Sequence, residues 1–255
     1  MQLFGAELLN EKLFGFALSF CRIGSFIMLL PGIGEIYVSA RIRLVFALFL
    51  SFICYLSINE NIGKMPDSSS LLFLSLFHEI VIGIFLGTVV RILIATMHTM
   101  GIIVSMQSGL SMAMMFDPTQ NAQGAVVGNF MTSLVMAFIF ISDTHHLFIR
   151  AFVNSFDIIK INHPIIIGEF TNYIVKTVGS SFDVGVKLAA PQILVSLLVV
   201  IASGLLARVF PVLQVFFLIT PLQLIISFTI LMITISILVT WFMQYFTEYL
   251  GSFLF

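Results

Sequence analysis

The sequence predicts an all-α, polytopic membrane protein built from long, kinked helical hairpins. Hydrophobic residues make up 60% of its 255 residues, charged residues make up 9%, and the mean hydropathy is +1.14. These values lie far outside the ratios of soluble domains. Several apolar stretches also approach or exceed the roughly 20 residues that one helix needs to cross a bilayer. The net charge of -1, without a cluster of Lys and Arg, excludes a nucleic-acid-binding surface.

The first apolar stretch is expected to remain in the protein. Glu7 and Glu11 precede it, whereas a secretory signal begins with basic residues and ends at a small-residue cleavage site. Cys21 and Cys54 lie inside apolar stretches without metal-like spacing, so we expect buried, inert thiols.

Apolar stretches define the expected helices. They cover residues 13–30, 44–58, 71–115, 125–142, 188–207 and 215–246. The second is short for a lipid-exposed span. The third would form a helix of about 65 Å at 1.5 Å per residue, which is too long for one crossing. We expect either one long bent helix that leaves the membrane plane or two helices that meet at a tight corner.

The same pattern divides the chain into three parts. Residues 1–124 are expected to form hairpins that end in a Met-rich loop, 125–187 a middle helical region, and 188–255 an apolar C-terminal hairpin. Residues 143–187 mix acidic and basic side chains, so we expect helical material outside the bilayer there. Prolines mark the expected turns and kinks, because proline removes a helical hydrogen bond. They are Pro31, Pro211 and Pro221.

Charged side chains lie within or at the edges of the apolar stretches. A charge at mid-bilayer costs at least about 2.5 to 3.5 kcal/mol, so these groups should face protein, water or headgroups. Arg22 and Arg208 could equally snorkel to an interface. The candidates are Arg22, Arg41, Arg43, Glu79, Arg91 and Arg208. Glu79 and Arg91 stand twelve residues apart, too far for contact within one straight helix, so each needs a partner elsewhere.

Small residues recur at four-residue steps, which favours close helix packing. Gly83 with Gly87, and Gly124 with Gly128, form two such pairs. A third series continues toward the Met-rich segment through Gly101, Ser105 and Gly109. These helices are therefore expected to have close neighbours.

The most distinctive segment runs from residue 107 to 118. Flexible, polarizable methionines gather there, and an Asp-Pro pair ends the run, because a residue before proline is pushed out of helical geometry. This chemistry suits a soft plug. The alternatives are a core gap filled by methionines and an ordinary Asp-Pro turn. The candidate plug residues are Met106, Gly109, Ser111, Met112, Met114, Met115, Phe116, Asp117 and Pro118.

No catalytic, cofactor or metal site is expected. Asp143, His145 and His146 lie close in sequence, and His78 adjoins Glu79, but neither group has a known ligand spacing. Adjacent histidines should point in different directions on a helix. We interpret residues 143–146 as a polar cap where an apolar stretch ends. Enzymatic activity is not expected, since no nucleophile pairs with a base.

Taken together, these motifs resemble the FliR family of the bacterial flagellar export apparatus and its counterparts in type III secretion. The resemblance covers nearly the whole chain. Three positions depart from the family pattern. Ser39 occupies a position where the family has a proline, Ala207 one where an asparagine is common, and Ile219 one where a glycine is common. The matching residues are Arg22, Pro31, Arg41, Arg43, Glu79, Gly83, Gly87, Gln107, Gly109, Leu110, Ser111, Ala113, Asp117, Pro118, His146, Gly204, Arg208, Pro211 and Pro221.

The resemblance implies an architecture and partners. One copy would join several FliP-like and FliQ-like subunits in a helical ring partly above the bilayer plane. That ring would sit in the bacterial inner membrane, inside the basal-body ring and beside a FlhB-like subunit. It would form the entrance for unfolded protein substrates, and residues 109–123 would plug the pore.

Three functions remain open at this point. The leading hypothesis is a non-enzymatic subunit of a protein-export gate. A small-solute or ion transporter is the alternative suggested by Glu79, Arg91 and broken helices. The third is a membrane scaffold without a pore.

Overall fold

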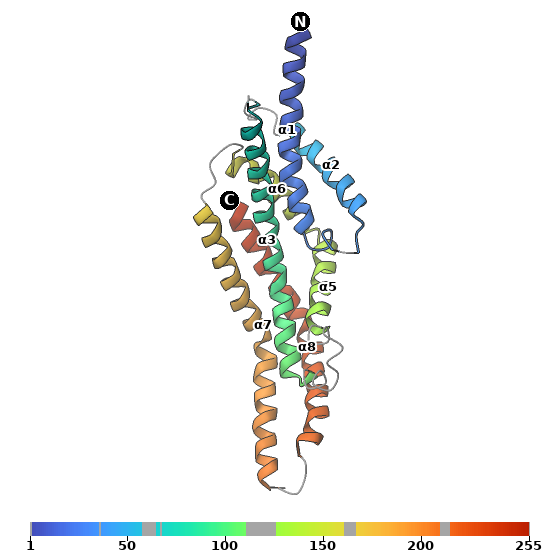
Figure 1. Ribbon diagram of the computed structural model, residues 1–255. Helices are drawn as coiled ribbons and strands as arrows, with labels where there is room; N and C mark the ends of the chain where they lie inside the picture. The colour runs from blue at the N-terminus through green and yellow to red at the C-terminus, as the bar shows by residue number, and fades with distance from the viewer. Residues whose placement is uncertain are drawn as a thin grey trace. The chain divides into compact units, whose positions relative to one another are not determined.

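The chain is helical in nearly all its described parts (Figure 1). The computed structural model describes residues 2–35, 37–57, 65–66, 68–110, 126–160, 167–209 and 215–254. Within these ranges no strand occurs, so the all-α prediction is confirmed. The helices are α1 (Gln2–Leu29), α2 (Ala40–Ser57), α3 (Ser69–Gln107), α5 (Val126–Ile141), α6 (His146–Ile158), α7 (Ile167–Val209) and α8 (Val215–Leu254).

Local signals set the helix ends. Pro31 follows α1, and Gly32 takes a φ of 88°, which only glycine adopts without strain. Helix α2 begins after Ser39, whose Oγ accepts the Ile42 N–H at 3.5 Å. Helix α3 begins after Ser68, whose Oγ accepts the Leu71 N–H at 3.3 Å. Serine thus satisfies otherwise unpaired N–H groups at two helix starts.

Helix α3 resolves the expectation for the long apolar stretch. It is one helix of 39 residues, about 58 Å long at 1.5 Å per residue, without a corner. It ends at Gln107, eight residues before the predicted limit of 115. Helix α7 is also continuous over 43 residues, so the mixed-charge residues 167–187 and the apolar residues that follow share one helix.

Membrane-spanning character is clear from length and composition. Among the described residues, four helical segments are apolar and long enough to cross a bilayer: Asn10–Leu29, Ser69–Gln107, Gly168–Val209 and Ile219–Gly251. A fifth results if α5 and α6 are counted as one broken span. The most apolar part of α3 is 61% buried, against 22% in the last two segments. Helix α3 is therefore an internal helix, whereas α7 and α8 expose most of their apolar surface.

The chain divides into two compact units. The first comprises Met1–Ile92, Thr144–Thr177 and Leu250–Phe255. Within it, α1 and α2 form a hairpin (Figure 1). The Phe16 and Tyr55 rings of this hairpin meet edge to face. Phe85 of α3 stacks on Phe170 of α7, with ring centroids 4.1 Å apart. The stacked rings join the first half of α3 to the start of α7.

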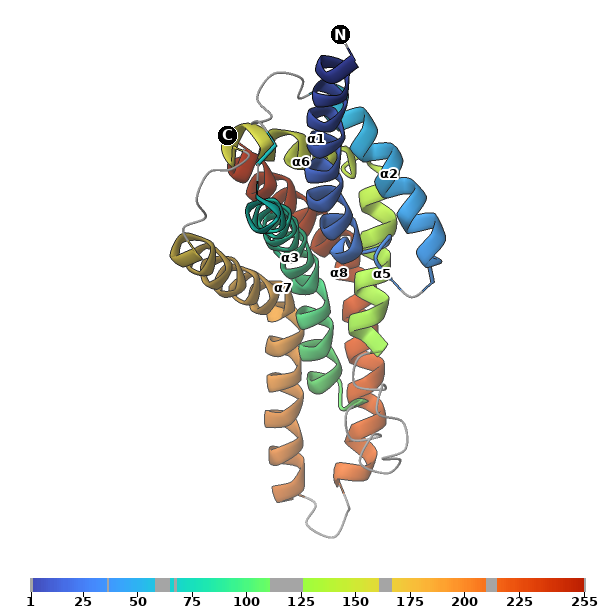
Figure 2. The ribbon, with the colours of Figure 1, turned by 45° about the horizontal axis from the view of Figure 1, so that its top comes forward.

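The second unit comprises Leu93–Asp143 and Val178–Tyr249. Its core joins the second half of α3 to α5, α7 and α8 (Figure 2). Val104 of α3, Ser108 just after α3, Val127 of α5 and Ser227 of α8 lie close together there. Ser180 of α7 and Tyr245 of α8 share a hydrogen bond of 3.1 Å.

Candidate functional sites

The structure describes the residues at the start of the candidate plug. Met106 is exposed, and Gly109 has a φ of 77°, where glycine favours the end of a helix. The Ser108 N–H still donates to the Val104 carbonyl at 2.9 Å, which fixes the last turn of α3. Other candidates lie outside the described residues: Ser111, Met112, Met114, Met115, Phe116, Asp117, Pro118 and the packing candidate Gly124.

Gln107, the last residue of α3, joins two other helices. The Ser196 hydroxyl of α7 donates to Gln107 Oε1 at 2.6 Å. The Gln223 side-chain amide of α8 donates to the Gln107 carbonyl at 2.7 Å. Ser196 and Gln223 did not stand out in the sequence, because lone polar residues in apolar helices give no spacing signal.

A buried ion pair forms the strongest charged site. Arg22 Nε of α1 donates to Glu79 Oε2 of α3 at 2.5 Å, and both side chains are essentially unexposed. Arg22 Nη1 donates to the Ser155 carbonyl at 3.0 Å, and Nη2 donates to the Ile159 carbonyl at 3.1 Å. The guanidinium carbon also lies 4.1 Å from the centre of the Phe156 ring. Arg22 thus neutralises the Glu79 carboxylate and donates hydrogen bonds to carbonyls at the C-terminal end of α6.

This geometry decides two open questions from the sequence. Glu79 finds its partner in Arg22, and Arg22 does not snorkel to an interface, because its relative exposure is 0%. The carbonyls that Arg22 binds lie at the C-terminal end of α6, where the helix dipole favours a cation. Sequence could not show this pairing, since 57 residues separate the two charges.

Glycines allow close helix contacts in both halves of α3. In the first unit, a Cβ on Gly83 would collide with Ser25 Oγ and the Arg22 carbonyl, and one on Gly87 would lie 2.7 Å from Leu29 Cβ. The Gly83 and Gly87 pair therefore packs α3 on α1, as the helix-packing prediction expected.

A second glycine contact belongs to the other unit. A Cβ on Gly101 would collide with Gly128 Cα, and one on Gly128 would lie 2.9 Å from the His98 carbonyl. The backbones of α3 and α5 thus meet at these two positions. On α7, a Cβ on Gly185 would lie 3.2 Å from the Thr96 carbonyl, a close approach that the sequence pattern did not predict.

The remaining charged candidates lie outside the buried network. Arg41 of α2 and Arg91 of α3 are exposed, as is Arg208 in the last turn of α7. Arg43 Nη1 donates to the Gly34 carbonyl at 3.2 Å and so braces the turn after α1. No ion pair involving Arg91 occurs within the described residues.

The proline and cysteine expectations have mixed outcomes. Pro31 lies in the turn after α1, Pro221 lies inside α8, and Pro211 falls outside the described residues. Pro191, which was not predicted as a helix feature, lies inside α7. Both cysteines are free; Cys54 is buried and Cys21 is half-buried.

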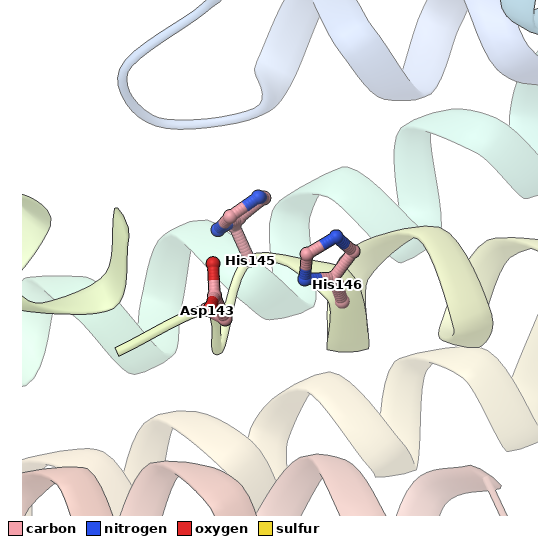
Figure 3. Close-up of side chains that lie close together, drawn as sticks. All are labelled: Asp143, His145 and His146. Atoms are coloured by element: carbon pink, nitrogen blue, oxygen red, sulfur yellow. The ribbon is translucent and has the colours of Figure 1, made fainter. Parts of the chain in front are cut away.

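The histidines after α5 behave differently from the expectation. Asp143, His145 and His146 stand on one short turn, and one potential ligand atom from each lies within 4.8 Å of the others (Figure 3). The two imidazole centroids are 4.3 Å apart. The expectation that the rings would diverge is wrong, because Asp143 adopts a φ of 56° and the chain turns here before α6 begins.

Comparison with known proteins identifies relatives over nearly the whole chain. The family model described as bacterial export proteins, family 1, matches residues 13–249. The chain is 36% identical over 220 residues to flagellar biosynthetic protein FliR of Caulobacter vibrioides, covering 86% of this chain and 88% of that protein. It is 30% identical over 226 residues to FliR of Bacillus subtilis, and the match covers 88% of this chain and 86% of that protein. It is 27% identical over 251 residues to FliR of Aquifex aeolicus, and the match covers 96% of this chain and 94% of that protein.

Proposed function

Because the chain belongs to the bacterial export proteins, family 1, and is a membrane subunit of a flagellar export apparatus, we propose that it helps to form the entrance pore for unfolded export substrates. The observation that carries this proposal is the family match over residues 13–249, which includes the long helices and both hydrogen-bonded sites. The protein acts in the bacterial inner membrane, at the basal body.

Partner subunits are the second part of the proposal. Helices α7 and α8 expose long apolar side chains that a soluble surface would not carry, among them Leu194, Leu198, Ile233 and Ile237. FliP-like, FliQ-like and FlhB-like membrane subunits, the basal-body ring and lipid are the proposed neighbours. Contact with such neighbours would cover the apolar side chains of α7 and α8. This explains why only 22% of the most apolar part of each helix is buried within the chain itself.

The plug is the third part. Residues 109–123 combine methionines, which adapt to irregular surfaces, with an Asp-Pro break. The segment begins where α3 ends, so it leaves the membrane protein's core at a defined point. We assign it the role of sealing the closed pore against ions.

Shortening the plug tests this function. Deleting most of residues 109–123 should leave the assembled complex intact but make the inner membrane leak ions, because the pore loses its seal. Ion flux into cells is measured alongside the amount of complex purified. As a control, a few residues of 58–64 are removed between α2 and α3, where no leak is expected. A tight membrane after the plug deletion would count against the plug, and a change in stability alone would favour a scaffold.

Of the two charged residues that suggested a transporter, only Arg91 still supports that alternative. Arg91 is exposed on an apolar helix, whereas Glu79 is now engaged by Arg22. Purified chain alone in liposomes provides the decisive comparison. Ion or solute flux without partner subunits would favour a transporter.

A further inference from the structure

The turn between α5 and α6 has a backbone that hydrogen bonds fix on both sides. Before the turn, the Ser142 N–H donates to the Phe138 carbonyl at 2.8 Å. After it, the Phe148 N–H donates to the His145 carbonyl at 3.1 Å. Phe148 is also 3% exposed, so a buried aromatic ring anchors this end of the turn. The side chains of residues 143–146 therefore start from a defined position.

Three potential metal ligands lie on this turn. Adjacent side chains on a regular helix do not face each other, but Asp143 adopts a φ of 56° and the chain turns. Its carboxylate and the imidazoles of His145 and His146 come together there (Figure 3). One ligand atom from each residue lies within 4.8 Å of the other two, and the imidazole centroids are 4.3 Å apart.

The spacing of these atoms is within reach of a single metal ion. Ligand atoms about 2.1 Å from a zinc ion stand roughly 3.4 Å apart in a tetrahedral arrangement. Atoms that already lie within 4.8 Å of one another need to approach by about 1.4 Å or less. Asp143 and His146 are exposed, so rotation about their side-chain bonds supplies this approach without disturbing the interior.

The ligand types select a class of ion. Imidazole nitrogens together with a carboxylate oxygen suit Zn²⁺ and the neighbouring transition metals. Mg²⁺ and Ca²⁺ prefer oxygen ligands alone, so they match this set poorly. Three protein ligands also leave a fourth position for water, which an exposed turn admits.

We propose that Asp143, His145 and His146 bind a divalent transition-metal ion such as Zn²⁺. The bound ion joins the residue that redirects the chain after α5 to the first residue of α6, and so braces the turn between the two helices. The site does not depend on the proposed pore. Its sequence, Asp-Thr-His-His, has no known ligand spacing, and only the turn brings the three side chains together.

Metal binding by the full-length chain tests the site. The protein is purified in detergent with a tag that contains no histidine, treated with a chelator and titrated with Zn²⁺. Wild type is expected to bind one Zn²⁺ per chain. Co²⁺, which absorbs visible light where Zn²⁺ does not, should give the spectrum of a tetrahedral site when it takes the same place.

Substitution of each ligand should weaken this binding. Asp143→Asn keeps a residue type that tolerates a positive φ and removes the charge, whereas His145→Phe and His146→Phe keep an aromatic ring without nitrogen. Each variant is expected to raise the Kd for Zn²⁺ at least about ten-fold, because losing even an outer partner of a metal ligand costs that much. As a matched control, Asp157→Asn removes an exposed carboxylate from α6 and should bind Zn²⁺ like wild type.

Chemical protection gives a second measurement that needs no substitution. Diethyl pyrocarbonate modifies accessible imidazole nitrogens, and a metal ion on those nitrogens blocks the reaction. In the wild-type protein, Zn²⁺ should slow the modification of His145 and His146 several-fold, as read from peptide masses. The half-buried His98 on α3 serves as the internal control, and its modification should not change.

The outcomes either support the site or overturn it. One bound Zn²⁺ in wild type, weakened binding in the three ligand variants and unaltered binding in Asp157→Asn support it. A wild-type chain that binds no Zn²⁺, or ligand variants that bind as tightly as wild type, would overturn it. If the ligand variants fail to fold, protection of His145 and His146 in wild type decides. None of these measurements records export or ion flux, so failure of the metal site leaves the export-gate proposal standing.

Discussion

At the scale of single residues, Arg22 dominates the first unit. Each of its three nitrogens donates to a carboxylate or a helix-end carbonyl, and its charge is balanced inside a stretch that is apolar enough to span a membrane. A buried charge that loses its partner cannot recover the cost of leaving water. Arg22 and Glu79 therefore depend on each other far more than exposed ion pairs do.

Removing one partner should be costly. Glu79→Gln is expected to lower the free energy of unfolding by about 3 to 5 kcal/mol, because it leaves the Arg22 charge buried and unpaired. Thermal unfolding of the purified protein measures the change. The matched control is Asp183→Asn, which breaks an exposed pair with Lys187 (60% and 58% exposed) and should cost less than about 0.5 kcal/mol. Equal effects of the two substitutions would refute the buried-pair argument.

At the scale of helices, close backbone contact organises α3. Where Gly101 meets Gly128, neither helix carries a side chain at the crossing, so the two backbones approach as closely as sterics allow. Membrane helices gain little from apolar burial alone, because lipid is equally apolar, so such close packing provides much of their attraction. One added methyl group at this crossing has no free space to enter.

A paired alanine experiment addresses this crossing. Gly101→Ala should destabilise the protein by roughly 1 to 3 kcal/mol, because the new Cβ forces α3 and α5 apart. Gly204→Ala in α7 meets no atom within 4 Å and should be neutral or stabilising, by up to about 1 kcal/mol, since alanine favours helices. Both are read from unfolding midpoints of the purified protein. A Gly101→Ala variant as stable as wild type would show that the helices separate without cost.

Sequence patterns predicted the helices better than their ends and partners. Composition and apolar length gave the all-α membrane class, and the small-residue steps gave Gly83 and Gly87 as packing positions. The end of α3 at Gln107 was missed, because apolar residues resume at Leu110 after the short Gln-Ser-Gly stretch and no proline follows before Pro118. The continuity of α7 through Pro191 was also missed. Contacts such as Gln107 with Ser196 join residues too distant for any periodicity to reveal.

At the scale of the whole molecule, exposed apolar surface is the governing property. Long stretches of α2, α7 and α8 present Leu, Ile and Phe side chains that neither unit buries. Only lipid or other membrane subunits can cover such surfaces stably. The chain is therefore suited to work as a component of a larger assembly.

Co-expression should reveal that assembly. A tagged copy produced with FliP-like and FliQ-like subunits, extracted in mild detergent, is expected to appear in native mass spectrometry as one copy among many partner copies. Produced alone, it should be extracted in lower amount, because its apolar faces lack partners. A chain that stays alone or pairs with itself in the presence of those subunits would contradict the export-gate proposal.

The Arg22 network also constrains how the protein is made. Ribosomes add about 5 to 20 residues per second, so Glu79 emerges about 3 to 11 s after Arg22, and Ser155 about 7 to 27 s after it. During that delay the guanidinium has no internal counter-ion or carbonyl to bind. The nascent first helix must therefore wait in the water-filled insertion machinery or at the lipid headgroups. Its final placement in the membrane depends on residues that have not yet been translated.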